Sequence, residues 1–329
     1  MPNDHPRIKH FTTLDDFLAD PDLDVVVVTT PPETHFSFAR QALEAGRHTF
    51  VEKPFVPSSA EAETLINISR EKGGLLCVYQ NRRWDSDFLT VQKLVTDGTI
   101  GRIVELDTHF DRYRPEKPAA GSWKGKLELE RGGTAVYDLG THLVDQAYVL
   151  FGPPRSVFAK FLSQRDGAIL GSGTKTEDLD IDSVAAHLYY DGGLIVNVRI
   201  GVVSAEARQP RFWVRGSRGS YRKFGLDPQE DQLRTAGGAR PGDAQYGRET
   251  TDWNGKLVLV DEDGAITQHD HPTAEPQTYS RIYELFGKAL QSGKEADIPV
   301  PASQARDVLK IIEAMKESAK SGKEVNVQL

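Results

Sequence analysis

The sequence predicts an α/β protein that begins with a parallel sheet and continues into a larger, mostly antiparallel open sheet. Helix-like and strand-like segments alternate over the first 80 residues, as they do in parallel β-α-β units. Strand-like segments dominate after residue 150, with the hairpin-turn signals "YYDGGL" and "DEDGAI" between them. Because a domain has about 150 residues, the 329 residues indicate two domains.

The first part of the chain shows a regular order of short elements. "TTLDDFLADP" reads as a short helix capped at Thr12 or Thr13. The four valines in "DLDVVVVTTPP" are typical of a strand buried on both faces of a parallel sheet. The next segments are expected to form helix, strand, helix and strand, with glycine stops after the helices. These segments are "ETHFSFARQALEAG", "RHTFVEKP", "SSAEAETLINISREKGG" and "LLCVYQNRRW".

The second part mixes helices with many alternating strands. A helix over "DSDFLTVQKLVTDGTIG" and a half-buried strand over "RIVELDTHFDRY" come first. Further strands lie between a helix at 134–151 and two closing helices at 276–292 and 302–321. The polar stretch 227–250 reads as a long mobile loop. We therefore expect one domain at 1–82 and a second domain at 83–329.

Composition and charge argue against several classes of function. A net charge of −8 and a pI near 5.7 disfavour a surface for nucleic acid or for an anionic membrane. No apolar run approaches the roughly 20 residues that span a bilayer, and the N-terminus has no segment of the signal-peptide type. Cys77 is the only cysteine, so no intrachain disulfide can form, and we expect a cytoplasmic protein.

Two predicted strands end in residues that can contact a ligand. Ligands bind beyond the carboxyl ends of parallel strands, and "TTPPETH" (29–35) and "EKP" (52–54) both lie at such ends. Thr30 and Pro31 bring the backbone close to a ligand there, and Lys53 places an amine beside it. The alternatives are an ordinary turn for the first motif and a surface Glu–Lys pair for the second. A lone histidine such as His35 is more often structural than functional.

The predicted helix at 134–151 carries three titratable side chains on one face. Asp138, His142 and Asp145 are spaced at i, i+4 and i+7. An aspartate one turn from a histidine can orient the imidazole and raise its basicity, which favours an acid–base pair. A polar patch on an amphipathic helix is the alternative. No third ligand with metal spacing accompanies the pair, and "HDH" (269–271) reads as a polar loop, so no metal site is predicted.

Four stretches together resemble the glucose-fructose oxidoreductase / inositol dehydrogenase (Gfo/Idh/MocA) family over nearly the whole chain. They are "VVVVTTPPETHFSFARQALEAGRHTFVEKPF", "YQNRRWDSDF", "GGTAVYDLGTHLVDQ" and "PRFWVRGSRGSYRKFGLDPQEDQL". The resemblance implies a Rossmann domain that binds NAD or NADP, and a C-terminal α/β domain whose open sheet commonly forms an oligomer interface. It also implies an oxidoreductase that acts on a small hydroxyl- or carbonyl-bearing molecule.

The resemblance also implies roles for particular residues. Lys53 matches the family's catalytic lysine, and Asp138 and His142 match an acid–base pair on the substrate side. The cofactor side is expected to include Thr30, Pro31, His35, Glu52 and Lys53, and the substrate side Tyr79, Arg82, Arg83, Trp84, Trp123 and Tyr137. The two arginines can hold a hydroxyl-rich or carboxylated substrate, and the indole of Trp84 can stack on a ring. The alternative for these three residues is an interdomain salt bridge and a core indole.

The family's first strand and its G-x-G-x-x-G motif have no counterpart before the valine strand. We therefore expect a partial, N-terminally truncated Rossmann sheet and weak, millimolar or no binding of NAD(P), because the glycine loop cradles the pyrophosphate. Three functions remain open from the sequence. They are an NAD(P)-dependent oxidoreductase, a shortened enzyme of cofactor-free isomerisation, elimination or cyclisation, and a non-catalytic regulatory binder.

The expected assembly is a homodimer. The alternating apolar positions of the second sheet exceed what two terminal helices can bury, and the resemblance implies an isologous interface at this face. The edge of the valine strand at 25–28 also needs a partner, because an uncovered apolar edge promotes aggregation. We expect the N-terminal segment "RIKHF" to cover that edge.

Overall fold

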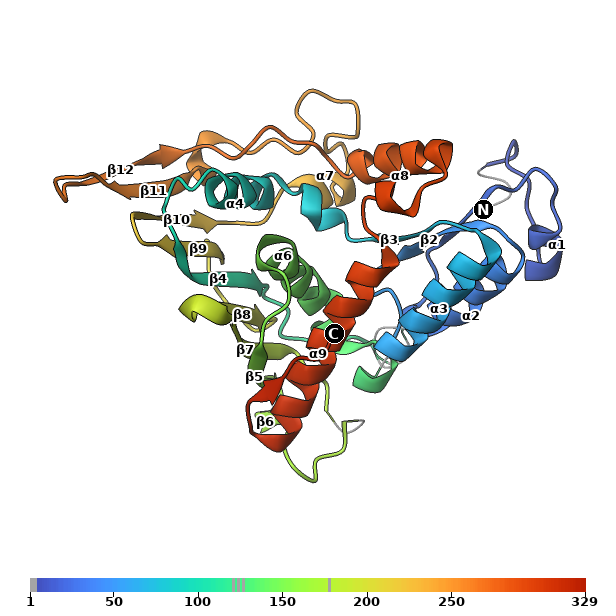
Figure 1. Cartoon of the computed structure of the whole chain (residues 1–329), viewed down its shortest axis with the longest axis horizontal. Helices are drawn as coiled ribbons and strands as arrows, with labels where there is room; N and C mark the ends of the chain where they lie inside the picture. The colour runs from blue at the N-terminus through green and yellow to red at the C-terminus, as the bar shows by residue number, and fades with distance from the viewer. Residues whose placement is uncertain (1–4, 120–121, 123–124, 126–127, 177–178) are drawn as a thin grey trace.

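The computed structural model describes residues 5–119, 122, 125, 128–176 and 179–329, which form two sheets flanked by helices. The first sheet is parallel, with the order β1-β2-β3, and it lies beside helices α2 and α3 (Figure 1). The bounds are α1 Leu14–Leu18, β1 Val25–Val28, α2 Pro32–Glu44, β2 His48–Glu52, α3 Ser59–Lys72 and β3 Leu76–Tyr79.

The second sheet has ten strands in the order β12-β11-β10-β9-β4-β8-β7-β5-β13, with β6 paired to β5. Only the β4–β8 pair is parallel among these described strands, so the predicted mostly antiparallel sheet is confirmed. The strand bounds are β4 Ile103–Asp111, β5 Ser156–Ser163, β6 Ala168–Ile169, β7 Ser183–Tyr189, β8 Ile195–Gly201, β9 Pro210–Gly216, β10 Gly219–Phe224, β11 Gly255–Val260, β12 Ile266–His271 and β13 Val325–Asn326.

Helix α9 joins the two sheets into one structure. It packs against α3 beside the first sheet and against α6 and β5 in the second part (Figure 1). The backbone N–H of Val78 in β3 also donates to the carbonyl of Val300, just before α9. The remaining helices are α4 Ser86–Thr96, α6 Thr141–Phe151, α7 Gln229–Arg234, α8 Ser280–Ser292 and α9 Ala302–Ser321.

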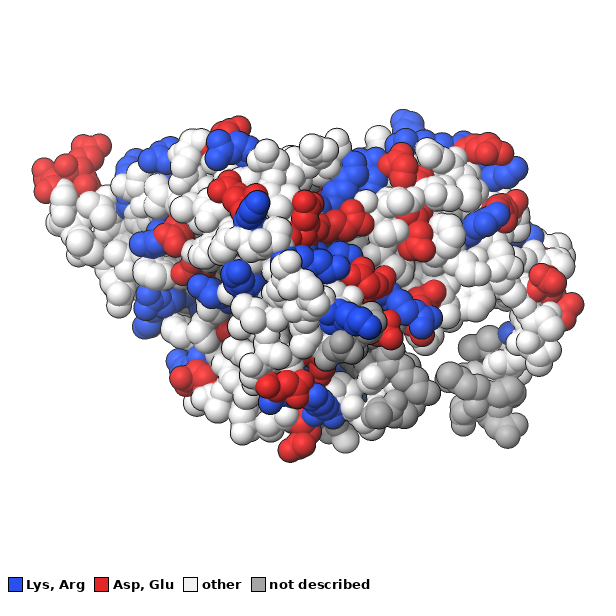
Figure 2. Space-filling view, turned by 90° about the horizontal axis from the view of Figure 1, so that it is seen from below, with Lys and Arg blue, Asp and Glu red and all other residues white. Residues whose placement is uncertain are grey.

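Local sequence signals explain where the helices begin and end. The Ser58 side chain accepts a hydrogen bond from the N–H of Glu61 at the start of α3, and Gly73 ends that helix with φ of 73°. Gly46 follows α2 in the same left-handed region, as its predicted role as a stop requires. Charged side chains of both signs are interspersed over the face shown in Figure 2, and the acidic β11–β12 turn forms one tip.

The prediction that the valine strand is buried on both faces is wrong. Val26 and Val28 are buried, but Val27 is 50% exposed. The reason is that β1 lies at the edge of its sheet. On the side opposite α2 and α3, α8 covers the neighbouring strands through Tyr283, whose ring centroid lies 5.2 Å from that of Phe50. This cover does not extend to Val27.

Two further expectations differ from the structure. The segment at 7–11 forms no strand, and β1 pairs only with β2 among the described strands. The prediction that this segment covers the free edge of β1 is therefore wrong. The stretch 227–250 is not wholly a loop, because it contains α7, anchored by the buried side chain of Gln229. Within the described residues, no helix is both long and apolar enough to cross a membrane.

Candidate active site

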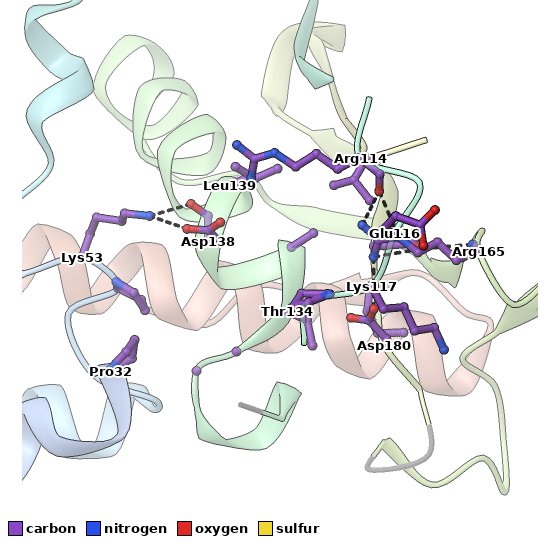
Figure 3. Close-up of a pocket in the computed structure, with 18 of the residues that line it drawn as sticks. Pro32, Lys53, Arg114, Glu116, Lys117, Thr134, Asp138, Leu139, Arg165 and Asp180 are labelled. Atoms are coloured by element: carbon purple, nitrogen blue, oxygen red, sulfur yellow. Dashed lines mark hydrogen bonds and ion pairs between the residues drawn. The ribbon is translucent and has the colours of Figure 1, made fainter. Parts of the chain in front are cut away.

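An ion pair between Lys53 and Asp138 joins the end of a strand of the first sheet to the helical segment before α6. Lys53 follows the carboxyl end of β2, and its ammonium Nζ lies 2.9 Å from Oδ1 of Asp138 and 2.7 Å from the backbone oxygen of Asp138. Figure 3 shows the two side chains pointing toward each other. Asp138 lies in a π-helical turn, Val136–Gly140, that precedes α6. Such turns are often found at functional sites.

Two cavities meet at this ion pair. The larger has a volume of about 720 Å³ and the smaller about 180 Å³. Five of the lining residues are shared by both cavities: Glu52, Lys53, Arg114, Asp138 and Leu139. A group that acts at the ion pair can therefore contact molecules in both cavities.

The larger cavity lies between the strand ends of the first sheet and loops of the second part (Figure 3). Thr29, Thr30 and Pro32 line it from the end of β1 and the start of α2. Thr134, which has a positive φ of 67°, lines it from the segment before the π-helical turn. Residues 114–118 and Arg165, Asp180, Ile181, Asp182 and Val202 form the opposite wall.

The smaller cavity contains His142, which is only 4% exposed. Burial lowers the pKa of His142 well below its usual value, and the positive charges of Lys53, Arg82, Arg211 and Arg112 lower it further. Its Nδ1 is buried without a hydrogen-bond partner among the described residues. A histidine in this environment is neutral near pH 7 and keeps a nitrogen lone pair, although it is a weaker base than a free imidazole.

Glu52 contributes a carboxyl group to both cavities. Its Oε2 accepts a hydrogen bond of 2.8 Å from the backbone N–H of Lys53. Burial raises the pKa of Glu52 above its usual value, although the nearby charge of Lys53 acts in the opposite direction. Glu52 therefore neutralises the basic groups around it less completely than an exposed carboxylate does.

The other expected cofactor-side residues have different positions. Thr30 lines the larger cavity, whereas Pro31 does not. The buried ring of His35 lies 2.8 Å from the carbonyl oxygen of Thr30 and 2.9 Å from that of Pro54. His35 thus joins the ends of β1 and β2, and this contact holds the two strand ends beside each other.

Of the expected substrate-side residues, Tyr79 and Arg82 line the smaller cavity. Arg83 instead forms a two-contact ion pair with Asp145, at 2.8 and 2.6 Å, and donates to Gln304. Arg83 therefore forms a salt bridge, as the alternative expected, but both partners lie within the expected second domain; the pair also accounts for Asp145.

The aromatic candidates are mostly outside the two cavities. Trp84 is 8% exposed and packs in the core, as the alternative interpretation expects. Tyr137 is 1% exposed, and its hydroxyl donates to the carbonyl of Pro57. Trp123 lies outside the described residues.

The predicted pairing of Asp138 with His142 is not made through Nδ1 of the imidazole. The sequence predicts a regular helix with both side chains on one face, but the π-helical turn changes the spacing of residues before Thr141. Asp138 binds Lys53 and does not accept a hydrogen bond from Nδ1 of His142. The two residues share the smaller cavity without this contact.

Eight residues of the smaller cavity were missed by the sequence analysis: Asn81, Phe110, Arg112, Arg114, Leu139, Glu230, Arg234 and Tyr279. Arg112 and Arg114 follow the buried Phe110 at alternate positions, and residues two apart lie on the same face of an extended chain. That spacing is a signal that the sequence contained. Glu230 lies on α7, within the stretch that was expected to be a loop, and no local signal indicated its role.

Comparisons with known proteins agree with this architecture. Residues 3–80 match the family described as "Oxidoreductase family, NAD-binding Rossmann fold", and residues 88–222 match "GFO/IDH/MocA C-terminal domain". An uncharacterized oxidoreductase of Schizosaccharomyces pombe is 37% identical over 331 residues, covering 98% of this chain and 86% of that protein. The scyllo-inositol 2-dehydrogenase (NADP(+)) IolW of Bacillus subtilis is 34% identical over 328 residues, covering 99% and 85%. The solved structure of a Bacillus subtilis oxidoreductase, yvaA, has a TM-score of 0.86 at 31% identity, covering 99% and 87%.

Proposed function

Because the chain belongs to the Gfo/Idh/MocA family of oxidoreductases, we propose that Lys53, Asp138 and His142 form its catalytic site. The reaction is the transfer of a hydride between NAD or NADP and a small hydroxyl- or carbonyl-bearing molecule. The relatives are named oxidoreductases and a dehydrogenase, which supports this function over cofactor-free acid–base chemistry or a non-catalytic role.

The observation that carries the proposal is the position of the Lys53–Asp138 pair between the two cavities. Asp138 accepts two hydrogen bonds from the ammonium of Lys53, through its carboxylate and its backbone oxygen. An ammonium has three N–H groups, so one remains for the oxygen of a substrate. Asp138 thereby fixes the direction in which Lys53 donates.

The larger cavity fits a nicotinamide nucleotide. It lies at the carboxyl ends of parallel strands, where the nucleotides of this fold bind, and its volume of about 720 Å³ exceeds that of the smaller cavity. Thr30, Pro32, Glu52 and Lys53 are the residues of the first part that would hold it. NAD or NADP supplies the hydride chemistry when it is bound.

The residues of this chain then move the proton. When a hydroxyl group is oxidised, its proton must leave the oxygen, and neutral His142 is in position to accept it, as is Lys53 once its ammonium has released a proton. When a carbonyl group is reduced, the ammonium of Lys53 donates a proton to the oxygen. The low exposure of His142 shields its ring from bulk water.

A direct assay tests this function. The protein is mixed with NAD⁺ or NADP⁺ and a panel of polyols and sugars that includes scyllo-inositol, and absorbance at 340 nm is followed. We expect reduction of one nucleotide with at least one compound, and loss of the signal in Lys53→Met. If every compound leaves both nucleotides oxidised, and the corresponding ketones leave NADH and NADPH unchanged, the proposed function is wrong.

We also propose that the chain acts in the cytoplasm as a homodimer, joined through the face of the large sheet opposite its helices. Along β4 the side chains of Leu106 and Phe110 are buried, whereas Glu105 and Asp107 alternate with them on the other face. That face also presents basic and aromatic groups, including the stacked Arg215 and Trp213 of β9. A face with both charges and aromatic rings can match its own copy across a two-fold axis.

A further inference from the structure

The smaller cavity is lined by more basic than acidic side chains. Five basic residues line it, and three acidic ones: Lys53, Arg82, Arg112, Arg114 and Arg234 against Glu52, Asp138 and Glu230. Such a surplus of positive charge favours the binding of a negatively charged group.

The ion pairs within the cavity identify where the surplus lies. Lys53 is paired with Asp138, and Arg82 is paired with Asp85 at 3.1 Å. Glu230 also pairs with Arg82, and among the described residues it is the one carboxylate that pairs with Arg112 and with Arg234. Burial acts to raise the pKa of Glu230, but these three arginines hold it below its usual value.

Arg114 has no hydrogen bond or ion pair from its guanidinium to any residue that the structure describes. Its backbone N–H donates to the carbonyl of Val202, and its backbone oxygen accepts from Arg165. Figure 3 shows the Arg114 side chain extending past Leu139 toward the Lys53–Asp138 pair. The guanidinium thus lies at the junction of the two cavities, which both contain it.

Arg112 is the second arginine whose guanidinium is only partly hydrogen-bonded within the described residues. It shares Glu230 at 3.1 Å, and its Nε is buried without a partner among the described residues. Its guanidinium carbon lies 5.0 Å from the centroid of Phe110, and that of Arg82 lies 4.8 Å from the same ring. The aromatic ring therefore supports both guanidinium groups at one wall of the cavity.

From this arrangement we propose that Arg112 and Arg114 bind a carboxylate of the substrate, next to the hydroxyl group that is oxidised. This substrate class, a hydroxy acid or sugar acid, rests on the proposed function. Guanidinium groups match a carboxylate with two parallel hydrogen bonds, and the ion pair with Glu230 shows that a carboxylate reaches the guanidinium of Arg112. Arg83, which the sequence offered for this role, is excluded by its pairing with Asp145.

Two other ligands present oxygen acceptors to these arginines, and the experiment must distinguish them from a substrate carboxylate. One is the phosphate of a bound nucleotide, because Arg114 also lines the larger cavity. The other is a neutral polyol such as scyllo-inositol, the substrate in the name of the Bacillus subtilis relative. A polyol accepts hydrogen bonds but leaves the surplus charge unbalanced.

The test compares acids with matched neutral sugars in wild-type protein, Arg112→Gln and Arg114→Gln. The pairs are glucuronate with glucose and galacturonate with galactose, with scyllo-inositol as a further neutral compound. Arg40→Gln, on the surface of α2, is the control for loss of one positive charge. Turnover is measured as kcat/KM, and binding is measured separately as the ligand-induced shift in Tm without nucleotide.

We expect at least one acid to exceed its neutral counterpart by roughly tenfold or more in kcat/KM. Each arginine variant should lower that value roughly 10- to 100-fold and change the neutral sugar less than threefold, because a hydrogen-bonded charge pair is lost. The acid should also raise Tm in wild-type and Arg40→Gln protein but not in Arg114→Gln. A rise in Tm with the acid in wild-type but not in Arg114→Gln protein, without any turnover, supports the carboxylate site and contradicts the proposed oxidoreductase function.

Three outcomes overturn the inference. The first is equal or better turnover of the neutral compounds. The second is the absence of any thermal shift with the acids together with no preference for them in turnover. The third is that Arg114→Gln binds NADPH tenfold more weakly, measured by nicotinamide fluorescence, while its ratio of acid to neutral turnover is unchanged. This result would assign the Arg114 guanidinium to the phosphate of the nucleotide.

Discussion

Replacing Lys53 by methionine removes the proton donor and keeps an unbranched side chain of similar length. The Lys53 side chain is 19% exposed and that of Asp138 is 42% exposed, so their ion pair is partly screened by water. Such a pair contributes about 1 kcal/mol or less to stability, which corresponds to a fall in Tm of at most about 4 °C. The fold is therefore expected to survive the change.

The effect on catalysis should be far larger. A positioned general acid or base contributes roughly 10²- to 10⁴-fold to rate, or about 3–5 kcal/mol of activation free energy. We expect kcat/KM for the Lys53→Met protein to fall by this factor in the 340 nm assay, with the Tm measured in parallel.

Lys93→Met is a matched control, because Lys93 pairs with Asp97 on an exposed helix face and lines neither cavity. It should leave kcat/KM within about twofold of wild type, since it removes the same charge without touching the site. A Lys53→Met protein with kcat/KM within threefold of wild type and a normal Tm would refute the catalytic assignment.

Three further predictions follow from the structure. The pKa of buried His142 is lowered, so its contribution to stability is full above its ordinary pKa of about 6.5 and is lost as the pH falls below that value. The free energy of unfolding, measured with urea, should therefore fall less between pH 7 and pH 5 in His142→Asn than in wild type. An equal fall in the two proteins contradicts this. Arg83→Met breaks a largely buried ion pair with Asp145 and should lower the free energy of unfolding by about 3–5 kcal/mol with KM unchanged, so a raised KM with normal stability would assign Arg83 to the substrate. Light scattering at micromolar concentration should give the mass of a dimer, and a clean monomer would count against the sheet-face interface.

Much of the fold followed from local patterns in the sequence. The valine run and the glycine stops located β1, α2 and α3 because β-branched residues favour strands and because glycine tolerates positive φ. Exposure was harder to predict, since it depends on what packs against an element. Val27 is half exposed because α8 covers β2 and β3 and does not reach it.

The site was predictable where it depended on the carboxyl ends of strands. Lys53 lies at such an end, and this position brings it to Asp138 from 85 residues away in the chain. The π-helical turn was not predictable, because "VYDLG" has the composition of an ordinary helix and the extra residue is fixed by tertiary contacts. Arg82 and Arg83 are adjacent and alike in sequence, and only the position of Asp145 decides that Arg83 is structural.

A crystal structure of the protein grown with millimolar NADPH, and a second grown with NADH, tests the central claim most directly. We expect the nicotinamide ring to lie in the larger cavity, in contact with Thr30 and Lys53, with the smaller cavity open beside it for the substrate. A nicotinamide bound elsewhere on the protein, or a larger cavity that stays empty at these concentrations of both nucleotides, would contradict the assignment of Lys53, Asp138 and His142 to hydride-transfer chemistry.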